Sequence, residues 1–483
     1  MADTKSTDLA IGSLQSKYAN GALTPTDVVE MHLERAATGA DSVWITRRDP
    51  QRLRERATEL ETTVDPENVD WETWPLYGVP FAVKDNIDHG STPTTAACPA
   101  YEYVPDKHAT VVEQLLDAGA IMVGKTNLDQ FATGLVGTRS PYGSTPNAID
   151  PAYISGGSSS GSSVAVALGQ VSFALGTDTA GSGRVPAALN GIVGLKPSRG
   201  LLSNNGVVPA CKSLDCVAVF ASTVRDALVV EQVASGFDPV DEYSRERAAD
   251  VDLSIEPVSE DLTIGIPHTD QLTFFGDSAA AECYDETVQW FNDWFQTRAV
   301  DIEPFIDAGR LLYQGPWVAE RLAAIQDLLA EHPDALLPVT RSIITRGRDF
   351  DAVDTYNAEY KLRRLARSAR DHLAEVDLLL TPTTGTTYTR AAVEERPVET
   401  NSNLGHYTNF VNLLDLAAVA VPAGRRPSGL PFGVTLFAAA FEDAKLASVA
   451  DTYCRERDVR LGSTADAYAA VPAPETHSSD DEL

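Results

Sequence analysis

Lysine is scarce in this chain of 483 residues, which has nine lysines among 38 basic residues, and the 69 acidic residues set the formal net charge at −31. A surface of that charge repels nucleic acid and anionic membranes, so neither is expected as a partner. An acidic, lysine-poor surface suits high intracellular salt, because screening removes its self-repulsion. The composition therefore predicts a salt-adapted, halophilic protein.

Long apolar runs are also missing, since no stretch of eighteen apolar residues occurs, and no transmembrane helix is expected. The N-terminus lacks a basic segment followed by an apolar core and does not predict a secretory signal. The cysteines number five, an odd count without a C-x-x-C pair, which favours a reducing, cytoplasmic location: Cys98, Cys211, Cys216, Cys283 and Cys454. Histidine and carboxylate residues show no ligand spacing either, so neither a metal nor an organic cofactor is expected.

What the chain does have is a long small-residue segment from Gly156 to Arg199. It begins with a turn of Gly and Ser at 156–161, continues into a predicted buried helix and a short apolar strand, and reaches a second small-residue turn at 177–183. A hydroxyl nucleophile on a tight turn, with backbone N–H groups nearby for an oxyanion, suits acyl transfer.

A lysine upstream is a candidate base. Lys84 ends the apolar stretch Tyr77-Gly-Val-Pro-Phe-Ala-Val, which predicts a strand, and Asp-Asn and Ile87 follow it. A free lysine, with a pKa near ~10.4, is charged at neutral pH and cannot accept a proton. Burial among apolar neighbours lowers the pKa of an amine, so Lys84 is expected to be buried and partly neutral.

Two other motifs compete for the same region. Residues 119–126 fit the phosphate-loop pattern G-x-x-x-x-G-K-[ST], but the apolar stretch at 120–123 predicts a strand where a phosphate loop is needed, and this interpretation is rejected. Residues 157–161 fit the G-x-S-x-G nucleophile elbow. No good strand precedes them and His406 has no evident pairing, so this interpretation ranks far behind.

The order of predicted elements favours an α/β fold with a central, mostly mixed sheet sandwiched by helices. Residues 1–65 predict a helical region packed on the core, 66–462 the main domain with a helical insertion at about 270–376, and 463–483 an acidic, disordered tail. Asp178 and Arg184 flank the second turn and are expected to pair and stiffen it. The polar segment 127–142 fits either a loop that walls the site or a capped helix start.

These motifs together resemble the amidase signature family. Ser158 follows a Gly pair, Ser182 lies 24 positions later, and Lys84 precedes Asp-Asn, as in that family's Ser–Ser–Lys triad. The resemblance implies that Lys84 is the base, Ser158 a proton relay after a cis peptide bond, and Ser182 the nucleophile. It also implies an oxyanion hole formed by backbone amides, those of Thr179, Ala180, Gly181 and Ser182.

A further stretch, at 313–321, resembles one branch of this family in particular. Gly315-Pro316 interrupts a predicted helix between Tyr313 and Arg321, which can point toward one face and could bind a carboxylate. The alternative role of Arg321 is a surface salt bridge with Glu320 or a neighbouring acidic residue. The stretches 126–143, 176–190, 206–216, 313–321 and 403–424 resemble the allophanate hydrolase branch of the family, in which the tyrosine and arginine hold the substrate carboxylate.

The branch implies a small ureido or amide substrate, ammonia release through an acyl-enzyme, a functional link to a urea carboxylase and a homodimer. Many members continue into a further C-terminal domain, and this chain resembles their amidase half alone. A broader amidase or biuret-type hydrolase, the A subunit of a glutamyl-tRNA amidotransferase and a non-catalytic ureido-binding protein remain alternatives.

Overall fold

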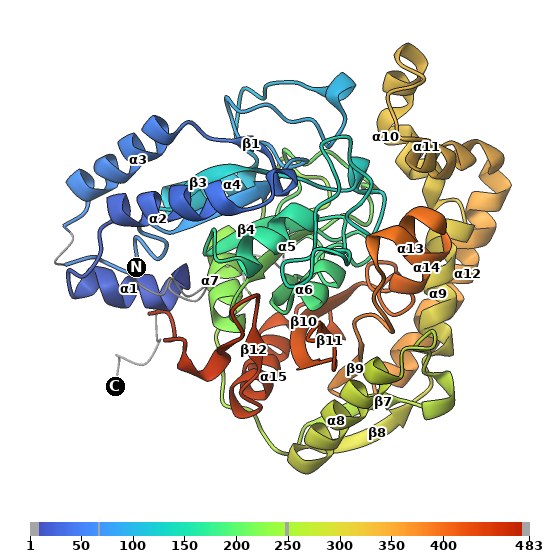
Figure 1. The fold of residues 1–483 in the computed structure, drawn as a ribbon. Coiled ribbons are helices and arrows are strands. Elements are labelled where there is room, and N and C mark those ends of the chain that lie inside the picture. The colour runs from blue at the N-terminus through green and yellow to red at the C-terminus, as the bar shows by residue number, and fades with distance from the viewer. Residues whose placement is uncertain (1–8, 66–67, 247–250, 476–483) are drawn as a thin grey trace.

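One 11-stranded sheet runs through the protein, and every element described below is arranged around it (Figure 1). The computed structural model describes residues 9–65, 68–246 and 251–475. The strand order is β1-β3-β2-β4-β6-β5-β10-β11-β9-β7-β8. The strands are β1 (Trp44–Arg47), β2 (Pro80–Lys84), β3 (Ile121–Thr126), β4 (Phe173–Thr177), β5 (Val193–Lys196), β6 (Val217–Ala221), β7 (Thr263–Pro267), β8 (Gln296–Val300), β9 (Leu378–Pro382), β10 (Leu416–Arg425) and β11 (Pro431–Ala439).

The sheet is mixed, with parallel pairs toward both ends and antiparallel pairs in the middle. β3, β2 and β4 are parallel to one another, as are β9, β7 and β8, whereas β4 through β11 to β9 pair antiparallel. Strands β2, β4 and β6 consist of buried residues only. β6 is apolar throughout, and the other two are apolar up to their last residues, Lys84 and Thr177. The predicted mixed sheet flanked by helices is confirmed.

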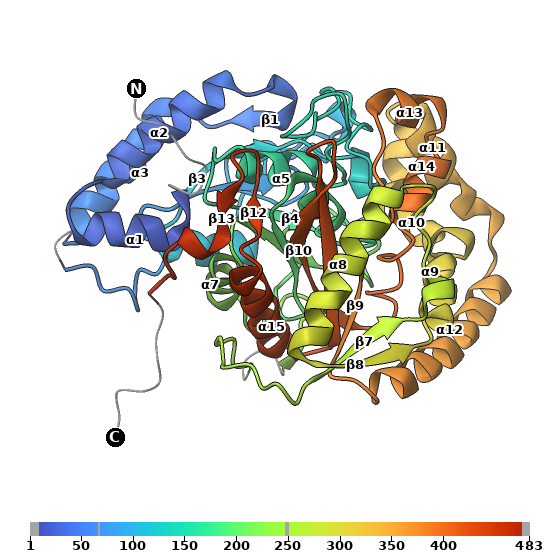
Figure 2. The same ribbon diagram turned by 60° about the horizontal axis from the view of Figure 1, so that its bottom comes forward.

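Helices cover both faces of the sheet (Figure 2). On one face α5 (Ser160–Ala167) contacts α6 (Val185–Asn190), and α6 packs on β10 and β11. On the other face α15 (Asp443–Glu456) packs on the same two strands and contacts α7 (Val224–Ala234), which touches α4 (Thr110–Asp117). α8 (Ser278–Trp294) also packs on β10. The core is therefore continuous through both layers.

The N-terminal region is helical, as predicted, but it also adds a strand to the sheet. It contains α1 (Ile11–Ala19), α2 (Pro25–Thr38) and α3 (Pro50–Thr63). Thr24 is the N-cap of helix α2 and forms a capping box with Asp27. Between α2 and α3, β1 pairs antiparallel with β3 and extends the sheet. The sequence did not indicate this strand, because it is only four residues long.

A run of helices lies beside the sheet at 303–373, inside the predicted insertion. It comprises α9 (Glu303–Gln314), α10 (Trp317–Glu331), α11 (Pro338–Thr345) and α12 (Ala352–Leu373). The break between α9 and α10 falls at Gly315 and Pro316, as expected. α8 and β8, which precede this run, belong to the sheet and its cover. Two short helices follow β9, α13 (Arg390–Glu395) and α14 (Glu399–Leu404).

The C-terminal segment is partly ordered, so the prediction of a disordered tail from 463 onward is wrong for its first part. Strand β12 (Arg460–Leu461) pairs with β13 (Asp466–Ala467), and the buried Tyr468 hydroxyl donates to Asp451 at 2.8 Å. Glu475 donates its backbone N–H to Gln15 of α1 at 2.6 Å. The segment 476–483 lies outside the described residues.

Within the described ranges, no helix combines the length and apolarity that crossing a bilayer would require. All five cysteines are buried and free.

Candidate active site

Lys84 ends β2 in the interior and touches one of the two predicted serines. Its Nζ donates to Ser158 Oγ at 2.8 Å and to Thr177 Oγ1 at 2.7 Å, and its exposed fraction is 0%. The contacts follow from the sheet, because β2 lies beside β4, which ends at Thr177. Ser158 lies just before α5, which packs on β2 and β4. Sequence analysis did not single out Thr177 as a partner of the lysine.

The electrostatics of this pocket favour an uncharged amine. Burial lowers the pKa of Lys84 to about 7, against the opposing attraction of Asp129, Asp215 and Asp178, while Arg321 lowers it further. Near neutral pH the amine therefore exists in substantial amounts beside a hydroxyl from which it can accept a proton. The predicted burial among Phe81, Ala82, Val83 and Ile87 is confirmed.

The backbone around Ser158 is held by the segment 127–142. The Gly157–Ser158 peptide bond is cis, as the resemblance implied. Asp129 donates its N–H to the Ser158 carbonyl at 3.0 Å, and its carboxylate accepts N–H groups from Gly137 and Arg139. A Cβ on Gly157 would lie 2.2 Å from the Asp129 carboxylate, so a side chain has no room there. Of the two interpretations of this segment, the structure supports the loop.

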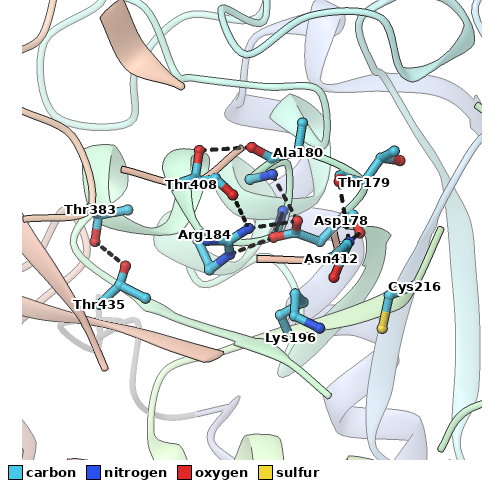
Figure 3. A network of polar contacts seen from close by, with 12 residues as sticks. Asp178, Thr179, Ala180, Arg184, Lys196, Cys216, Thr383, Thr408, Asn412 and Thr435 are labelled. Atoms are coloured by element: carbon cyan, nitrogen blue, oxygen red, sulfur yellow. Dashed lines mark hydrogen bonds and ion pairs between the residues drawn. The ribbon is translucent and has the colours of Figure 1, made fainter. Parts of the chain in front are cut away.

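The second turn is stiffened by the predicted ion pair (Figure 3). Arg184 Nε and Nη2 donate to the two carboxylate oxygens of Asp178 at 2.9 Å each, and both side chains are fully buried. The same carboxylate accepts the N–H of Gly181 at 2.7 Å and that of Gly183 at 3.0 Å. Although burial alone would raise it, the pKa of Asp178 is lowered, because Arg184 stabilises the carboxylate.

The segment 403–424 holds the same turn by its carbonyl groups (Figure 3). Thr408 Oγ1 donates to the Ala180 carbonyl at 2.7 Å. Asn412 Nδ2 donates to the Asp178 carbonyl at 2.6 Å and to that of Thr179 at 3.2 Å. The carbonyl groups are thus turned away from the N–H groups of the turn. Sequence analysis gave Thr408 and Asn412 no role, because they lie more than 200 residues from the turn.

One predicted oxyanion donor does not fit. The N–H of Gly181 is already engaged by Asp178, so Gly181 is not free to bind an oxyanion. The backbone N–H groups of Thr179, Ala180 and Ser182 have no hydrogen-bond partner within the described chain. Three of the four predicted amides are therefore available.

Ser182 is 2% exposed and lies between these amides and α6. Its hydroxyl makes no hydrogen bond to any described residue, Ser158 included. The structure thus joins Lys84 to Ser158, while transfer of the proton onward from Ser182 stays a prediction.

Tyr313 and Arg321 lie together, as predicted, on the two sides of the helix break. Arg321 Nη2 donates to the Tyr313 hydroxyl at 3.3 Å, and its guanidinium carbon lies 5.3 Å from the tyrosine ring centroid. Arg321 Nη1 donates to Thr133 Oγ1 at 3.1 Å in the loop 127–142 that also holds Ser158. The alternative role is not observed, because Glu320 binds Ser213 instead.

The charge of Arg321 is not balanced by a contacting carboxylate. The side chain is 2% exposed, it forms no ion pair within the described ranges, and its Nε has no hydrogen-bond partner there. A guanidinium desolvated without an anion is costly, so the arrangement favours an anionic ligand.

A cavity of about 430 Å³ opens beside this pair and has Tyr313 in its wall. Its lining is rich in cations, with Arg139, Arg310 and Arg346 among the wall residues. Arg139 is buried, and it donates to the carbonyls of Thr133 and Pro397. Arg310 is ion-paired with Glu303 and Asp307, whereas Arg139 and Arg346 form no ion pair within the described ranges, so these two supply the unbalanced positive charge of the wall. Neither Ser158 nor Ser182 lines this cavity.

The structure also excludes a phosphate loop at residues 119–126 and a nucleophile elbow at residues 157–161. Lys125 is fully buried in an ion pair with Asp85 at 3.1 Å, inside strand β3, and cannot meet a phosphate. Ser159, the central serine of the G-x-S-x-G match, is buried and donates to the Thr177 carbonyl at 3.2 Å. In the described part of the chain, no group of three or more His, Cys, Asp or Glu residues is arranged to hold a metal.

Comparison with known proteins decides the family. The family model described as Amidase matches residues 27–447. The chain belongs to the amidase family. The resemblance drawn from the motifs is confirmed, and so is the class of enzyme, a hydrolase of C–N bonds.

Among its relatives, this amidase is 47% identical over 420 residues to a urea amidolyase of Saccharomyces cerevisiae. That match covers 86% of this chain but only 22% of the yeast protein. The allophanate hydrolase of Kluyveromyces lactis superposes with a TM-score of 0.89 at 42% identity, covering 98% of this chain and 78% of that one. The A subunit of a glutamyl-tRNA(Gln) amidotransferase of Synechococcus sp. is 33% identical over 93% of this chain and 98% of its own length.

Proposed function

We propose that this amidase hydrolyses the terminal carboxamide of allophanate, releasing ammonia. The observation that carries the proposal is the buried guanidinium of Arg321, which contacts no carboxylate within the described ranges and lies beside the Tyr313 hydroxyl. Allophanate places a carboxylate and a carboxamide at opposite ends of a short planar ureido group. Arg321 and Tyr313 would bind the carboxylate, which would leave the carboxamide for Ser182.

The chemistry we assign to the triad is proton relay followed by acyl transfer. Lys84, as the amine, accepts the proton of Ser158, and Ser158 takes that of Ser182 as Ser182 Oγ attacks the carboxamide carbon. The N–H groups of Thr179, Ala180 and Ser182 stabilise the resulting oxyanion. The proton returns to the leaving nitrogen as the C–N bond breaks, and ammonia departs from a carbamoyl-type acyl-enzyme.

Deacylation uses the same groups in reverse. A water molecule gives a proton through Ser158 to Lys84 and attacks the acyl carbon, and the proton returns to Ser182 Oγ when the ester bond breaks. The product is a nitrogen carrying two carboxylates, whose decarboxylation the proposal leaves to a later step. We further propose that the reaction occurs in the cytoplasm and uses the product of a urea carboxylase. Similarity to proteins called urea amidolyase supports that link.

The test compares an anionic substrate with a neutral one of the same shape. Arg321→Ala should lower kcat/KM for allophanate by roughly 10²–10³-fold, because two charge-assisted hydrogen bonds are lost. It should lower kcat/KM for biuret, which has a carboxamide in place of the carboxylate, less than about tenfold. Arg310→Ala, which removes a cavity-wall cation outside this pair, is the matched control, and Ser182→Ala gives the background rate. Equal losses on both substrates would contradict the carboxylate role.

Two alternatives remain, and each has its own outcome. A broader amidase or biuret-type hydrolase would prefer biuret or simple amides in the wild type. An amidotransferase component would need a B-type partner protein, which a pull-down would detect. The Tyr313–Arg321 pair argues against both, because neither a neutral amide nor a glutaminyl side chain supplies an anion at that position.

A further inference from the structure

The cavity of about 430 Å³ beside Tyr313 has more room than one small ureido anion needs, since sites of ~300–1,000 Å³ hold drug-sized ligands. Its wall is formed by α9, by the end of α11 and by α14, which lie side by side in Figures 1 and 2. Arg321 does not line it. The cavity is therefore a separate space that shares the side chain of Tyr313 with the candidate active site.

The wall of this cavity carries positive charge that no neighbouring acid balances. None of the described residues that line it is acidic, although the chain has 69 acidic residues. Arg346, which directly follows α11, is exposed and forms no ion pair within the described ranges. Arg139 is 3% exposed and likewise has no ion-pair partner there. One unpaired cation thus lies at the solvent side of the cavity and another at its buried side.

Three buried polar atoms of the wall residues have no hydrogen-bond partner among the described residues. They are Arg139 Nε, His406 Nε2 and Asn409 Oδ1. His406 adds no charge at neutral pH, because burial and the nearby Arg310 lower its pKa to about 4. A buried donor or acceptor without a partner costs free energy that a bound ligand can recover. The guanidinium suits a carboxylate and the amide oxygen suits an N–H group, so a ligand that carries both fits this wall.

We propose that the cavity is a second anion subsite, which binds small carboxylates that also carry amide or ureido N–H groups. Arg346 attracts the carboxylate from solvent, Arg139 holds it at the buried side, and Asn409 accepts an N–H. The ligand then moves past Tyr313 to Arg321. The role of the subsite in turnover rests on the proposed function, whereas its affinity for such anions does not.

The loop residue Thr133 connects this subsite to the inner pair. Arg139 Nη1 donates to the Thr133 carbonyl at 2.9 Å, and Arg321 Nη1 donates to Thr133 Oγ1 at 3.1 Å. Tyr313, in the cavity wall, accepts from Arg321 Nη2 at 3.3 Å. The three arginines at 346, 139 and 321 therefore lead from an exposed position to a buried one. Cations arranged in this way concentrate an anion that the net charge of −31 would otherwise repel.

Calorimetry tests the subsite without turnover, with N-carbamoylglycine as the probe, because it carries a carboxylate and ureido N–H groups. The full chain with Ser182→Ala and Arg321→Ala, which lacks the nucleophile and the inner cation, should still bind one equivalent, and Ser182→Ala alone should bind two. Adding Arg346→Gln to the double variant should raise the dissociation constant about tenfold or more, because a charge-assisted contact is lost. The matched control is Arg348→Gln, which removes an exposed cation from the same turn but outside the cavity, and it should change the constant less than about twofold.

A second variant tests the polar wall. Asn409→Asp keeps the size and the acceptor of the side chain but adds a negative charge. It should raise the dissociation constant of N-carbamoylglycine about tenfold or more and leave that of its neutral amide unchanged, because only the anion is repelled. Thermal unfolding of each variant shows that it is folded.

Kinetics test the role of the subsite in turnover. In the otherwise unchanged enzyme, Arg346→Gln should raise KM for allophanate about five- to tenfold, leave kcat within about twofold and leave biuret hydrolysis unchanged, because Arg346 meets the anion before the reaction. A wild type that does not hydrolyse allophanate would refute the proposed function, and the calorimetry would still decide on the subsite. The subsite is overturned if the double variant binds no N-carbamoylglycine, if Arg346→Gln and Arg348→Gln have equal effects, or if Arg346→Gln lowers kcat with KM unchanged.

Discussion

The pKa of Lys84 yields a prediction with two independent readouts. Burial lowers that pKa from 10.5 to about 7. Each unit is worth about 1.4 kcal/mol, so the folded protein disfavours the ammonium by about 5 kcal/mol. At pH 7 about half of the molecules therefore hold an amine, against about one in three thousand for an unperturbed lysine.

The first readout is activity. If the amine is the base, kcat/KM should rise about tenfold per pH unit below pH 7 and level off above about pH 8. Lys84→Met should lose activity by roughly 10³-fold or more at every pH. Ammonia release measured across this range checks both statements. A rate that is independent of pH between 6 and 8 would refute the assignment of Lys84 as the base.

The second readout is stability. Between pH 7 and 10.5 the unfolded lysine binds a proton that the folded one does not, so wild-type stability rises with pH in that window and is flat below it. Lys84→Met removes the free-energy cost of burying the ammonium. It also removes the hydrogen bonds that Lys84 donates to Ser158 and Thr177, at a cost of about 1–3 kcal/mol. Its free energy of unfolding should exceed the wild-type value by about 2–4 kcal/mol near pH 6.

That advantage should shrink by about 3 kcal/mol between pH 6 and pH 9, since the wild type is then relieved of most of the proton penalty. Urea unfolding of both proteins at the two pH values measures it. A difference that does not change with pH would mean that Lys84 titrates normally, and the physical account of the base would be wrong.

Two further predictions concern the second turn (177–183) and the charge of the protein surface. Asn412→Ala removes both hydrogen bonds to the Asp178 and Thr179 carbonyls. It should lower kcat about tenfold to a hundredfold with little change in KM. The control is Thr435→Val, which breaks the buried hydroxyl contact with Thr383 and should lower only the melting temperature. Steady-state kinetics and thermal unfolding, measured on both variants, separate these effects. Equal kcat in the two variants would contradict a role of the Asn412 hydrogen bonds in holding the turn for catalysis. Dialysis into dilute buffer should reduce activity and stability together, because the surface charge of −31 is then unscreened. Full activity at low salt would argue against salt adaptation.

The sequence was informative where local pattern and burial agree. The apolar run before Lys84 predicted a buried strand, and the break at Gly315–Pro316 predicted the helix ends that bring Tyr313 to Arg321. The Asp178–Arg184 pair was also foreseeable, since the two residues flank one turn.

The rest depends on contacts between distant segments. Thr408 and Asn412 reach the turn only because β10 follows them into the middle of the sheet, which no local pattern indicates. The engagement of Gly181 by Asp178 is a matter of turn geometry, which composition does not specify. The disordered tail was predicted to start too early, at residue 463, for a similar reason. Tyr468 is ordered by a buried hydrogen bond to the distant Asp451, not by residues next to it in sequence.

The groups to which we assign the reaction and those to which we assign substrate binding come from different parts of the fold. The sheet and the helices α5 and α6 that cover it carry Lys84, Ser158 and Ser182. Packing there is tight, because a methyl group on Gly194 would collide with the Gly183 carbonyl of the second turn. Tyr313 and Arg321 belong to a separate helical layer. Substitutions in α9 and α10 can therefore change which substrate binds without replacing Lys84, Ser158 or Ser182. They are not without effect on the reaction, because Arg321 also lowers the pKa of Lys84. Grafting a foreign α9–α10 pair onto this scaffold is the direct route to a new specificity.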